Sequence, residues 1–546
     1  MGMGEQAQAE ALARAFVRGE LSRRELFRRA GGFGMVVVAS TSLGAVLAAC
    51  SSNGGAPAPS ASSGRTAGKP KPGGTLKAAL TGEPDTLDPA TSTIYTGAQV
   101  YDNIFNKLID LDPDGNFYGQ LATKWQAADE KTWVFDLVSG ARFHNGEPFT
   151  PQDVKYTFER ILDPKTASSY APLYDVIDSV EVTGPTQVTF HLKSPFGPFL
   201  SNLANNGEIV NQKAIESADP ARNPVGTGPF KFFEWVQGDH VTLQKWDQYF
   251  QKGLPFLDGV QFFFRNVDES RIDALRSGEL NWIDAVPLQD LSALKSDPTF
   301  TYVTAPNAGI PDFLALNTKK SPFDDKLVRQ AVYWAIDRDA IRQVAYFGAG
   351  ETGIEEVPTG SIWYDGAPVV KPDLDRARNL LAQAGHTSGL TVEYLGLPQY
   401  PELLKTGEVV RQQLQQIGIT VNIKQVDVSV WFDAFIKGNY QITSAYQERT
   451  IDPDNFYALV IRTGGDINTT GYSNPQADAL IDQARRSTDD NQRKDLYKQL
   501  RQIVFEDAPI IFVHYETINY LMQKDVGGST VNPTLELRLQ NVGFTG

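Results

Sequence analysis

Residue types that carry out covalent chemistry are few and scattered in this sequence. The 546 residues include five histidines and one cysteine, and none of the patterns G-x-S-x-G, H-E-x-x-H or G-x-x-x-x-G-K-S/T occurs. His144 stands in a turn-like Phe-His-Asn-Gly segment without a cysteine or paired base beside it. The Gly226-Thr227-Gly228-Pro229 segment lacks the third glycine of a phosphate loop. We therefore interpret both segments as structural, and we expect no enzyme, no metal site and no cofactor.

The single cysteine has a different use. Cys50 ends the segment Leu47-Ala48-Ala49-Cys50, which has the form of a bacterial lipobox. Small residues let a signal peptidase bind the backbone, and the thiol can accept a diacylglyceryl group. Two acyl chains then give durable attachment to a membrane. We predict lipidation at Cys50, because a buried core cysteine is a poor fit between an export signal and a Ser/Gly/Pro-rich run.

An export signal precedes that cysteine. Ser22 to Arg29 matches the twin-arginine export pattern, and the uncharged stretch from Phe33 to Ala49 is moderately hydrophobic. An ordinary membrane anchor of that length is the alternative interpretation. We predict a twin-arginine lipoprotein signal peptide at residues 1–49, followed by the lipidated cysteine and a flexible tether at 50–73.

Composition and charge describe a large, folded, acidic protein. Hydrophobic residues make up 41% and aromatic residues 11% of the chain, so it can bury sizeable cores, and its length implies two or more domains. The formal charge is −15. An acidic surface gains no counterion release from phosphates, so we expect no nucleic-acid partner.

Periodicity separates a mixed first part from a regular second part. Strands are expected at 75–80, 132–137 and 188–192, with helices at 97–108 and from Pro151 onward. From about residue 310, a long helix is expected around 325–345, and strands and helices then alternate. This β-α-β-α-β order predicts a parallel sheet covered by helices. The expected segments are helix 375–384, strand 390–395, helix 401–417, strand 419–425, helix 429–437, strand 440–445, helices 475–487 and 490–506, and strand 510–515.

One long stretch carries a family resemblance. Leu121 to Leu162 closely resembles the signature of the family 5 extracellular solute-binding proteins, the dipeptide, oligopeptide and nickel-binding receptors of ABC importers. Further segments agree, in the expected order over 74–515. They are Gly74-Thr75-Leu76, Leu87-Asp88-Pro89, Gly226 to Phe230, Leu316-Asn317-Thr318, Gly471 to Pro475 and Asp507-Ala508-Pro509.

The resemblance implies an α/β fold of the two-lobed, periplasmic-binding-protein-like type (class II, cluster C), with an extra small domain on lobe I. A ligand buried between two lobes contacts both and so stabilises the closed state. The closed form would dock on a membrane permease, and the protein itself would perform no covalent chemistry. The implied parts are lobe I at 74–115, 210–308 and 508–546, the extra domain at 116–209, and lobe II at 309–507.

The resemblance also points to one departure in the ligand site. In peptide-binding members, a lobe II loop carries an aspartate that holds the ligand's α-amine, three residues ahead of the acid of an Asp-Pro pair. Here that acid is Asp452, and the corresponding position is Arg449. A guanidinium suits an anionic or strongly accepting group. The alternative is a surface Arg449 paired with Glu448 or Asp452, and a buried Arg449 would have Asp452 as its nearest partner.

Other candidate ligand residues follow from the same resemblance. Tyr446 falls where members often have an aromatic residue, so it either stacks on a ligand or packs against the preceding strand. Tyr95 and Thr96 follow the Leu-Asp-Pro turn of lobe I, and Asn468 precedes the Gly471-Tyr472 turn. Trp431 is expected in a helix core.

We therefore predict a monomeric lipoprotein on the outer face of the cytoplasmic membrane. It would capture an oligopeptide or peptide-like solute for an ABC permease and ATPase complex. The alternatives are a non-peptide solute, such as an oligosaccharide, an opine or another anionic compound, and a non-transport protein acting as a surface sensor or secreted enzyme. A nickel chelate is disfavoured, because no histidine pair is evident.

Overall fold

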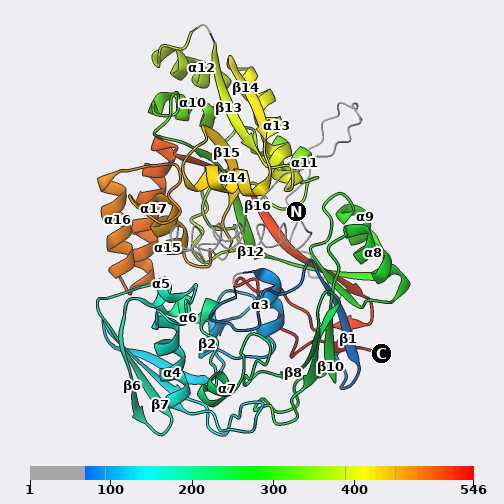
Figure 1. The fold of residues 1–546 in the computed structure, drawn as a ribbon. Coiled ribbons are helices and arrows are strands. Elements are labelled where there is room, and N and C mark those ends of the chain that lie inside the picture. Colours follow the sequence, from blue (N-terminus) through cyan, green and yellow to red (C-terminus); the bar gives the residue numbers. More distant parts are fainter. Residues whose placement is uncertain (1–67, 93, 388, 449) are drawn as a thin grey trace.

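A ten-stranded sheet runs through two lobes of the molecule (Figure 1). The computed structural model describes residues 68–92, 94–387, 389–448 and 450–546. The predicted signal peptide, Cys50, most of the tether and Arg449 lie outside these residues. Within them, no helix combines the length and apolar character needed to cross a membrane.

The order of the strands shows how the lobes are joined. Parallel pairs lie toward both ends of the sheet, and the two longest strands, β12 and β16, pair antiparallel in its middle. In spatial order the strands are β14 (Ile419–Gln425), β13 (Leu390–Gly396), β15 (Ile442–Tyr446), β12 (Phe300–Leu316), β16 (Ile510–Gln523), β11 (Trp282–Asp284), β1 (Thr75–Leu80), β10 (Gly259–Phe264), β9 (His240–Lys245) and β8 (Phe230–Val236).

We call the part around β13, β14 and β15 lobe II; it lies at the top of Figure 1. Side chains alternate between the two faces of a strand. On β12, Leu314 and Leu316 therefore face one core, whereas Phe313 and Ala315 face the other. The first core is covered by α10 (Lys326–Ala335), α11 (Arg338–Ala345), α12 (Leu374–Gln383) and α13 (Pro401–Gln415). The second is covered by α14 (Val428–Ile436), α15 (Pro453–Phe456), the π-helix η1 (Tyr457–Ile461), α16 (Pro475–Arg486) and α17 (Asp490–Asp507).

We call the part around β1 and β8–β11 lobe I. It is covered on one face by α8 (Asp268–Ser277) and α9 (Leu291–Ser296). The other core contains α3 (Tyr95–Tyr101) and the C-terminal tail, where Leu535, Leu537 and Leu539 are buried. The tail also carries the short pair β17 (Val526–Gly527) and β18 (Gly543–Phe544). The lobe I core is thus completed by the last residues of the chain.

The extra domain has its own core and its own sheet, at the lower left of Figure 1. Its helix α4 begins at Pro151, as the sequence predicts, and Thr150 and Asp153 form a capping box at this start. Its elements are β2 (Ile109–Leu111), β3 (Phe117–Gly119), β4 (Ala122–Asp129), β5 (Thr132–Leu137), α4 (Pro151–Leu162), α5 (Ala171–Tyr174), β6 (Ile177–Gly184), β7 (Gln187–Leu192) and α6 (Phe199–Asn206). The next helix, α7 (Gln212–Ser217), places Ile215 against the lobe I core. The predicted residue boundaries between the parts remain a prediction.

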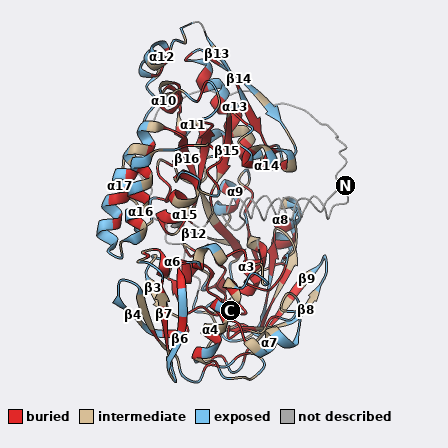
Figure 2. Cartoon of the chain, turned by 60° about the vertical axis from the view of Figure 1, so that its left-hand side comes forward, coloured by how far each residue is buried: buried red, intermediate tan, exposed pale blue. Residues whose placement is uncertain are grey.

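Buried side chains concentrate along the central strands, and exposed ones lie on the outer faces of helices such as α16 and α17 (Figure 2). The predicted parallel β-α-β-α-β unit is confirmed, and Trp431 is buried in a lobe II core. The single helix expected at 325–345 is wrong. It is two helices, because Asp337 accepts a hydrogen bond from the Ala340 amide and caps α11. The helix expected at 97–108 ends at Tyr101.

Candidate functional site

A cavity of about 630 Å³ lies between the two lobes. Lobe I contributes the segments after β1 and β11 and the starts of α3 and α8. Lobe II contributes the segments after β13 and β15 and the end of α11. Binding sites in such sheets form beyond the carboxyl ends of parallel strands, and cavities of roughly 300–1,000 Å³ hold small solutes. This cavity is therefore the candidate binding cleft.

The lining of the cleft is acidic. Five carboxylates and two cations line it, which leaves an excess of three negative charges among the described residues. They are Asp268, Asp284, Glu402, Glu448 and Glu516, with Arg271 and Lys405. Arg271 is already paired, because its Nη2 lies 2.6 Å from Asp268. The ammonium of Lys405 lies 4.2 Å from the ring centre of Phe347.

Asp284 is the most deeply buried of these carboxylates, with 2% of its surface exposed. Its Oδ2 accepts a hydrogen bond of 2.9 Å from the Gln99 amide, whereas Oδ1 has no hydrogen-bond partner among the described residues. Burial raises the pKa of Asp284 to about 6, an effect that Gln99 and Arg271 reduce. At neutral pH the cleft thus holds a mostly ionised carboxylate with one unused acceptor.

Residues with a left-handed backbone conformation are concentrated around the cleft. Of the five non-glycine residues with positive φ in the described chain, three line it: Ala285 at +45°, Phe347 at +53° and Leu535 at +63°. Such conformations are costly for residues with a Cβ, and they concentrate at functional sites. The loops that form the cleft are therefore held in shapes that the surrounding structure imposes.

Two of the predicted ligand residues, Tyr95 and Tyr446, line the cleft from opposite lobes. The ring of Tyr446 lies 6.2 Å from that of Tyr400, tilted by 45°. Burial raises the pKa of Tyr95 well above its usual range, and Tyr520, Asp284 and Glu448 add to this effect. The Tyr95 phenol is thus neutral and lies near one carboxylate of each lobe.

Two other predicted residues are outside the cleft lining. Thr96 is buried, and its hydroxyl donates a 3.4 Å hydrogen bond to the Glu83 carbonyl. The Asn468 amide donates to the carbonyls of Arg462 and Tyr472. The Asn468 contacts hold the turn in which it lies, and a ligand contact of either residue stays a prediction.

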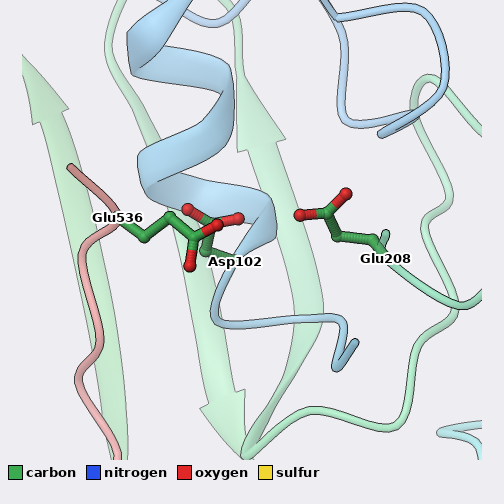
Figure 3. Close-up of side chains that lie close together, drawn as sticks. All are labelled: Asp102, Glu208 and Glu536. Carbon is green, nitrogen blue, oxygen red and sulfur yellow. The ribbon is translucent and has the colours of Figure 1, made fainter. Parts of the chain in front are cut away.

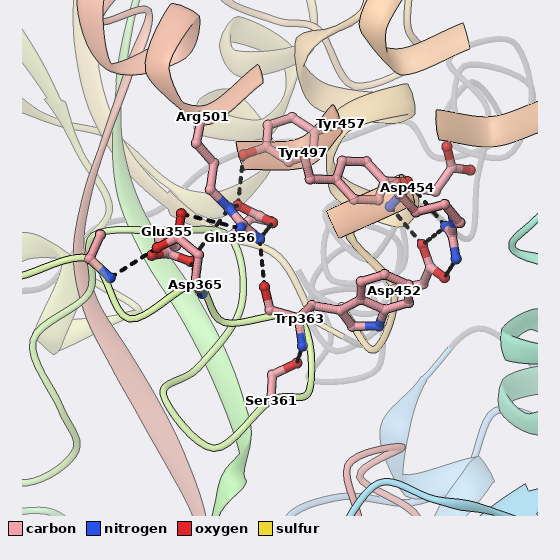
Figure 4. A network of polar contacts seen from close by, with 12 residues as sticks. Glu355, Glu356, Ser361, Trp363, Asp365, Asp452, Asp454, Tyr457, Tyr497 and Arg501 are labelled. Atoms are coloured by element: carbon pink, nitrogen blue, oxygen red, sulfur yellow. Dashed lines mark hydrogen bonds and ion pairs between the residues drawn. The ribbon is translucent and has the colours of Figure 1, made fainter. Parts of the chain in front are cut away.

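Asp452 is fully buried, and the structure pairs it with Arg493 (Figure 4). The two guanidinium nitrogens of Arg493 lie 2.6 and 2.9 Å from the two carboxylate oxygens. The Ser201 hydroxyl of the extra domain donates to the same carboxylate at 3.2 Å. Asp452 also caps α15 by accepting from the Asp454 amide. The structure thus assigns Asp452 a structural contact outside the cleft lining, and Arg449 lies outside the described residues.

A second buried network lies beside this pair in Figure 4. Arg501 binds Glu356, and the Tyr457 hydroxyl donates to the same carboxylate at 2.7 Å. Burial, aided by a hydrogen bond with Asp365, raises the pKa of Glu355 to about 8. The network ties the 355–365 loop to α17, so it stabilises lobe II.

A smaller cavity of about 110 Å³ lies between the extra domain and lobe II. Trp133, Leu200, Trp363 and Arg493 are among its lining residues. Its volume is below the range of ordinary ligand sites, so it is not the candidate site.

Three buried acids, Asp102, Glu208 and Glu536, place carboxylate oxygens within 4.8 Å of one another (Figure 3). Two cations already pair with acids in this region: Lys107 lies 3.3 Å from Asp110 and also binds Glu536, while Arg538 binds Glu536 and lies 2.7 Å from Asp110. Burial and then Glu536 raise the pKa of Asp102 well above its usual range. An acid whose pKa is raised, in a region that already contains two cations, is a poor cation site. We interpret the cluster as a structural link between α3 and the tail.

The two segments that resembled fragments of catalytic motifs bind each other. The Gly226 amide donates to Nδ1 of His144 at 3.4 Å, and Nε2 of His144 lies 3.0 Å from the Gly228 carbonyl. Burial lowers the pKa of His144 to about 4. A Cβ on Gly226 would lie 2.1 Å from the Ile104 carbonyl oxygen. These glycines therefore permit close backbone packing, as the structural interpretation expected.

Sequence reasoning missed the acidic character of the cleft. Asp284, Glu402 and Glu516 come from three segments far apart in the chain. The signal that could have revealed these acids is their position relative to the ends of the strands. Asp284 ends β11, and Glu402 follows β13 after a short loop, so each acid lies at the carboxyl end of a strand that has a parallel neighbour in its own lobe.

Comparison with known proteins agrees with this geometry. Residues 116–468 match the model of the bacterial extracellular solute-binding proteins, family 5 Middle. The glutathione-binding protein GsiB of Pectobacterium atrosepticum is 26% identical over 479 residues, covering 84% of this chain and 92% of the relative.

Solved structures of the same size superpose over nearly their whole length. The binding protein AgaA from A. tumefaciens R10, in complex with agropinic acid, is 31% identical with a TM-score of 0.73, covering 86% of this chain and 99% of that one. The ABC transporter-associated periplasmic binding protein DppA from Helicobacter pylori, in complex with the peptide STSA, is 26% identical with a TM-score of 0.73, covering 87% and 99%. The described fold is thus that of two-lobed periplasmic binding proteins.

Proposed function

This chain belongs to the bacterial extracellular solute-binding proteins of family 5, and we propose that it captures a peptide-like solute and delivers it to the permease of an ABC importer. The observation that carries the proposal is the cavity of about 630 Å³ whose walls come from both lobes. Relatives that bind glutathione and a peptide support the choice of solute class. The protein's own task is binding, without covalent chemistry.

Closure follows from the placement of the site. A solute in the cleft contacts Tyr95 of lobe I and Tyr446 of lobe II at once, so it stabilises the arrangement in which both are near. We propose these two tyrosines and Arg449 as ligand contacts. The closed arrangement is the one that a permease would recognise, since only it presents both lobes in a fixed relation.

The test combines thermal unfolding with small-angle scattering on the purified protein. A ligand that binds only the folded state stabilises it by about 2.7 kcal/mol at a hundredfold excess over Kd. Among tripeptides, glutathione, oligosaccharides and opines, a peptide-like compound should raise the Tm and reduce the radius of gyration. A rise in Tm without compaction contradicts closure of the lobes, and a response to oligosaccharides alone contradicts the solute class.

We also propose that the protein is held at the outer face of the cytoplasmic membrane, as a monomer, by lipid on Cys50. The supporting observations are the lipobox and the twin-arginine pattern. Cys50→Ser should move the protein from the membrane fraction to the soluble fraction of cells without changing its Tm. Ser51→Ala serves as the control. A Cys50→Ser variant that stays in the membrane fraction contradicts the lipid anchor.

A further inference from the structure

We propose that Asp312 and His514 share one buried proton that holds together the two strands joining the lobes, so that the folded protein loses stability as the pH rises above about 6.5. The proposal goes beyond solute capture, because it concerns β12 and β16 and needs no ligand. It makes the junction of the lobes a pH-sensitive part of the fold.

The two side chains meet within the long strand pair that runs through both lobes. Asp312 of β12 lies opposite His514 of β16, and Nδ1 of His514 lies 2.9 Å from Oδ2 of Asp312. The next residue of β12, Phe313, lies opposite Phe512, so Val513 is an extra residue in β16 and forms a bulge. The pair therefore lies at an irregularity of the strands that join the lobes.

The hydrogen bonds of His514 determine how many protons the pair holds. Its Nε2 lies 3.0 Å from the Ala349 carbonyl oxygen, which can only accept, so Nε2 carries a hydrogen. Its Nδ1 faces a carboxylate oxygen, and two acceptors need a proton between them to form a hydrogen bond. A second proton therefore lies between Nδ1 and Oδ2, whichever of the two groups carries it.

Burial makes this proton hard to remove. Asp312 is 2% exposed and His514 is 1% exposed. The Tyr346 ring stacks on the imidazole with 3.6 Å between the ring centres, and a Cβ on Gly350 would lie 2.3 Å from Nε2. Burial raises the pKa of Asp312 well above its usual range and lowers the pKa of His514 to about 4, so both directions favour an uncharged pair. Loss of the proton would leave a buried carboxylate facing a ring nitrogen that cannot donate to it.

Other charged and titratable side chains face the pair, or the Tyr346 ring stacked on it, from β15, β16, α11, α13 and the segment after α11. They are Tyr446, Glu516, Arg342, Glu402 and Glu351. All of them are kept when Asp312 alone is changed. A comparison of wild type with an Asp312 variant therefore isolates the shared proton.

The proton count sets the expected pH dependence of folding. Above about pH 6.5 an unfolded chain holds a neutral histidine and an ionised aspartate, which is one proton fewer than the folded pair holds. The folding equilibrium constant should therefore fall by about tenfold per pH unit, until the folded pair releases its proton. Between about pH 4 and pH 6.5 the unfolded histidine is protonated, so both states hold the same number of protons and the pair adds no slope.

The experiment measures the free energy of unfolding by denaturant titration between about pH 5 and pH 9. In Asp312→Asn the amide can donate to Nδ1 without a shared proton. This variant should lack the loss above about pH 6.5 and should lose stability below it, because only its unfolded histidine then takes up a proton. The matched control is Asp239→Asn, which changes a histidine–aspartate pair with a similar distance, 2.8 Å, but with a carboxylate that is 52% exposed. It should follow wild type.

The same pH dependence in wild type and Asp312→Asn overturns the proposal. So does a control that departs from wild type as far as Asp312→Asn does, because the effect would then not depend on burial. If Asp312→Asn fails to fold, nitrogen-15 NMR of the wild-type histidines gives the second measurement. His514 should carry a hydrogen on Nε2 and should not titrate near its ordinary pKa of about 6.5, and the opposite result for either overturns the proposal. None of these outcomes bears on solute capture.

Discussion

The Asp452–Arg493 pair offers a quantitative test of the interior of lobe II. Both side chains are at most 1% exposed, and the ion pair is bidentate, with distances of 2.6 and 2.9 Å between the Arg493 nitrogens and the Asp452 oxygens. Replacing Arg493 by methionine keeps much of the volume but leaves a buried carboxylate with only the Ser201 hydroxyl and the α15 cap as partners. Breaking a buried pair in this way costs about 3–5 kcal/mol.

The loss converts to a measurable shift in Tm. Unfolding entropy near 2.1 cal/mol/K per residue gives ~1 kcal/mol/K for about 480 folded residues, so Arg493→Met should lower the Tm by about 3–5 °C. The double variant Asp452→Asn/Arg493→Met neutralises the orphaned carboxylate while keeping the cap, and it should recover much of that loss. Arg276→Met breaks an exposed pair at 3.9 Å and is the control, with an unchanged Tm expected.

Differential scanning calorimetry decides between the outcomes. A Tm of Arg493→Met within about 1 °C of wild type refutes the reasoning, because a loss of this size should shift it by several degrees. So does a double variant that is no more stable than the single one, because the penalty was assigned to the unpaired charge. Either result would mean that water or a rearranged side chain replaces Arg493.

Three further predictions concern pH and packing. The pKa of Glu355 is about 8 in the fold, whereas its ordinary value is 4.5, so protonation of Glu355 favours the folded state. The resulting contribution to the free energy of unfolding is fully present below pH 4.5 and is lost as the pH rises to about 8. The Tm difference between wild type and Glu355→Gln, measured by calorimetry, should therefore change over that window and stay constant above it. The pKa of Asp284 is about 6 in the fold against 3.8 as its ordinary value, so its protonated form also favours folding; the Tm difference between wild type and Asp284→Asn should change between about pH 3.8 and pH 6 and stay constant above that. Gly226→Ala should cost about 1–3 kcal/mol, since its Cβ would meet the Ile104 carbonyl, whereas Gly82→Ala, with open space around it, should be neutral in denaturant titrations.

Local patterns predicted the regular part of lobe II because each signal there is short-range. The strand at 419–425 agrees residue for residue, and Gly418, with φ of +86°, lies just before it as a residue suited to stopping a helix. The split at Asp337 was missed because an apolar period alone does not reveal a cap inside it.

The cleft was harder to predict, because its chemistry depends on distant segments. Tyr95 and Tyr446 were placed by resemblance, and both line it. The partner of Asp452 lies 41 residues away on α17, and Asp284 meets Gln99 across 185 residues. Only the packed sheet brings such groups together, so spacing along the chain carries no signal for them.

The position of β16 has a consequence for how the chain folds as it is made. β16 lies between β12 and β11, and the residues after it fill the lobe I core. Lobe I therefore contains both the first strand, β1, and the last residues of the chain, and its contacts span more than 400 residues, as between Asn103 and Leu537. Long-range contacts of this kind form slowly. Lobe I can be completed only after residues 535–539 have left the ribosome, whereas most of lobe II can pack before they are synthesised.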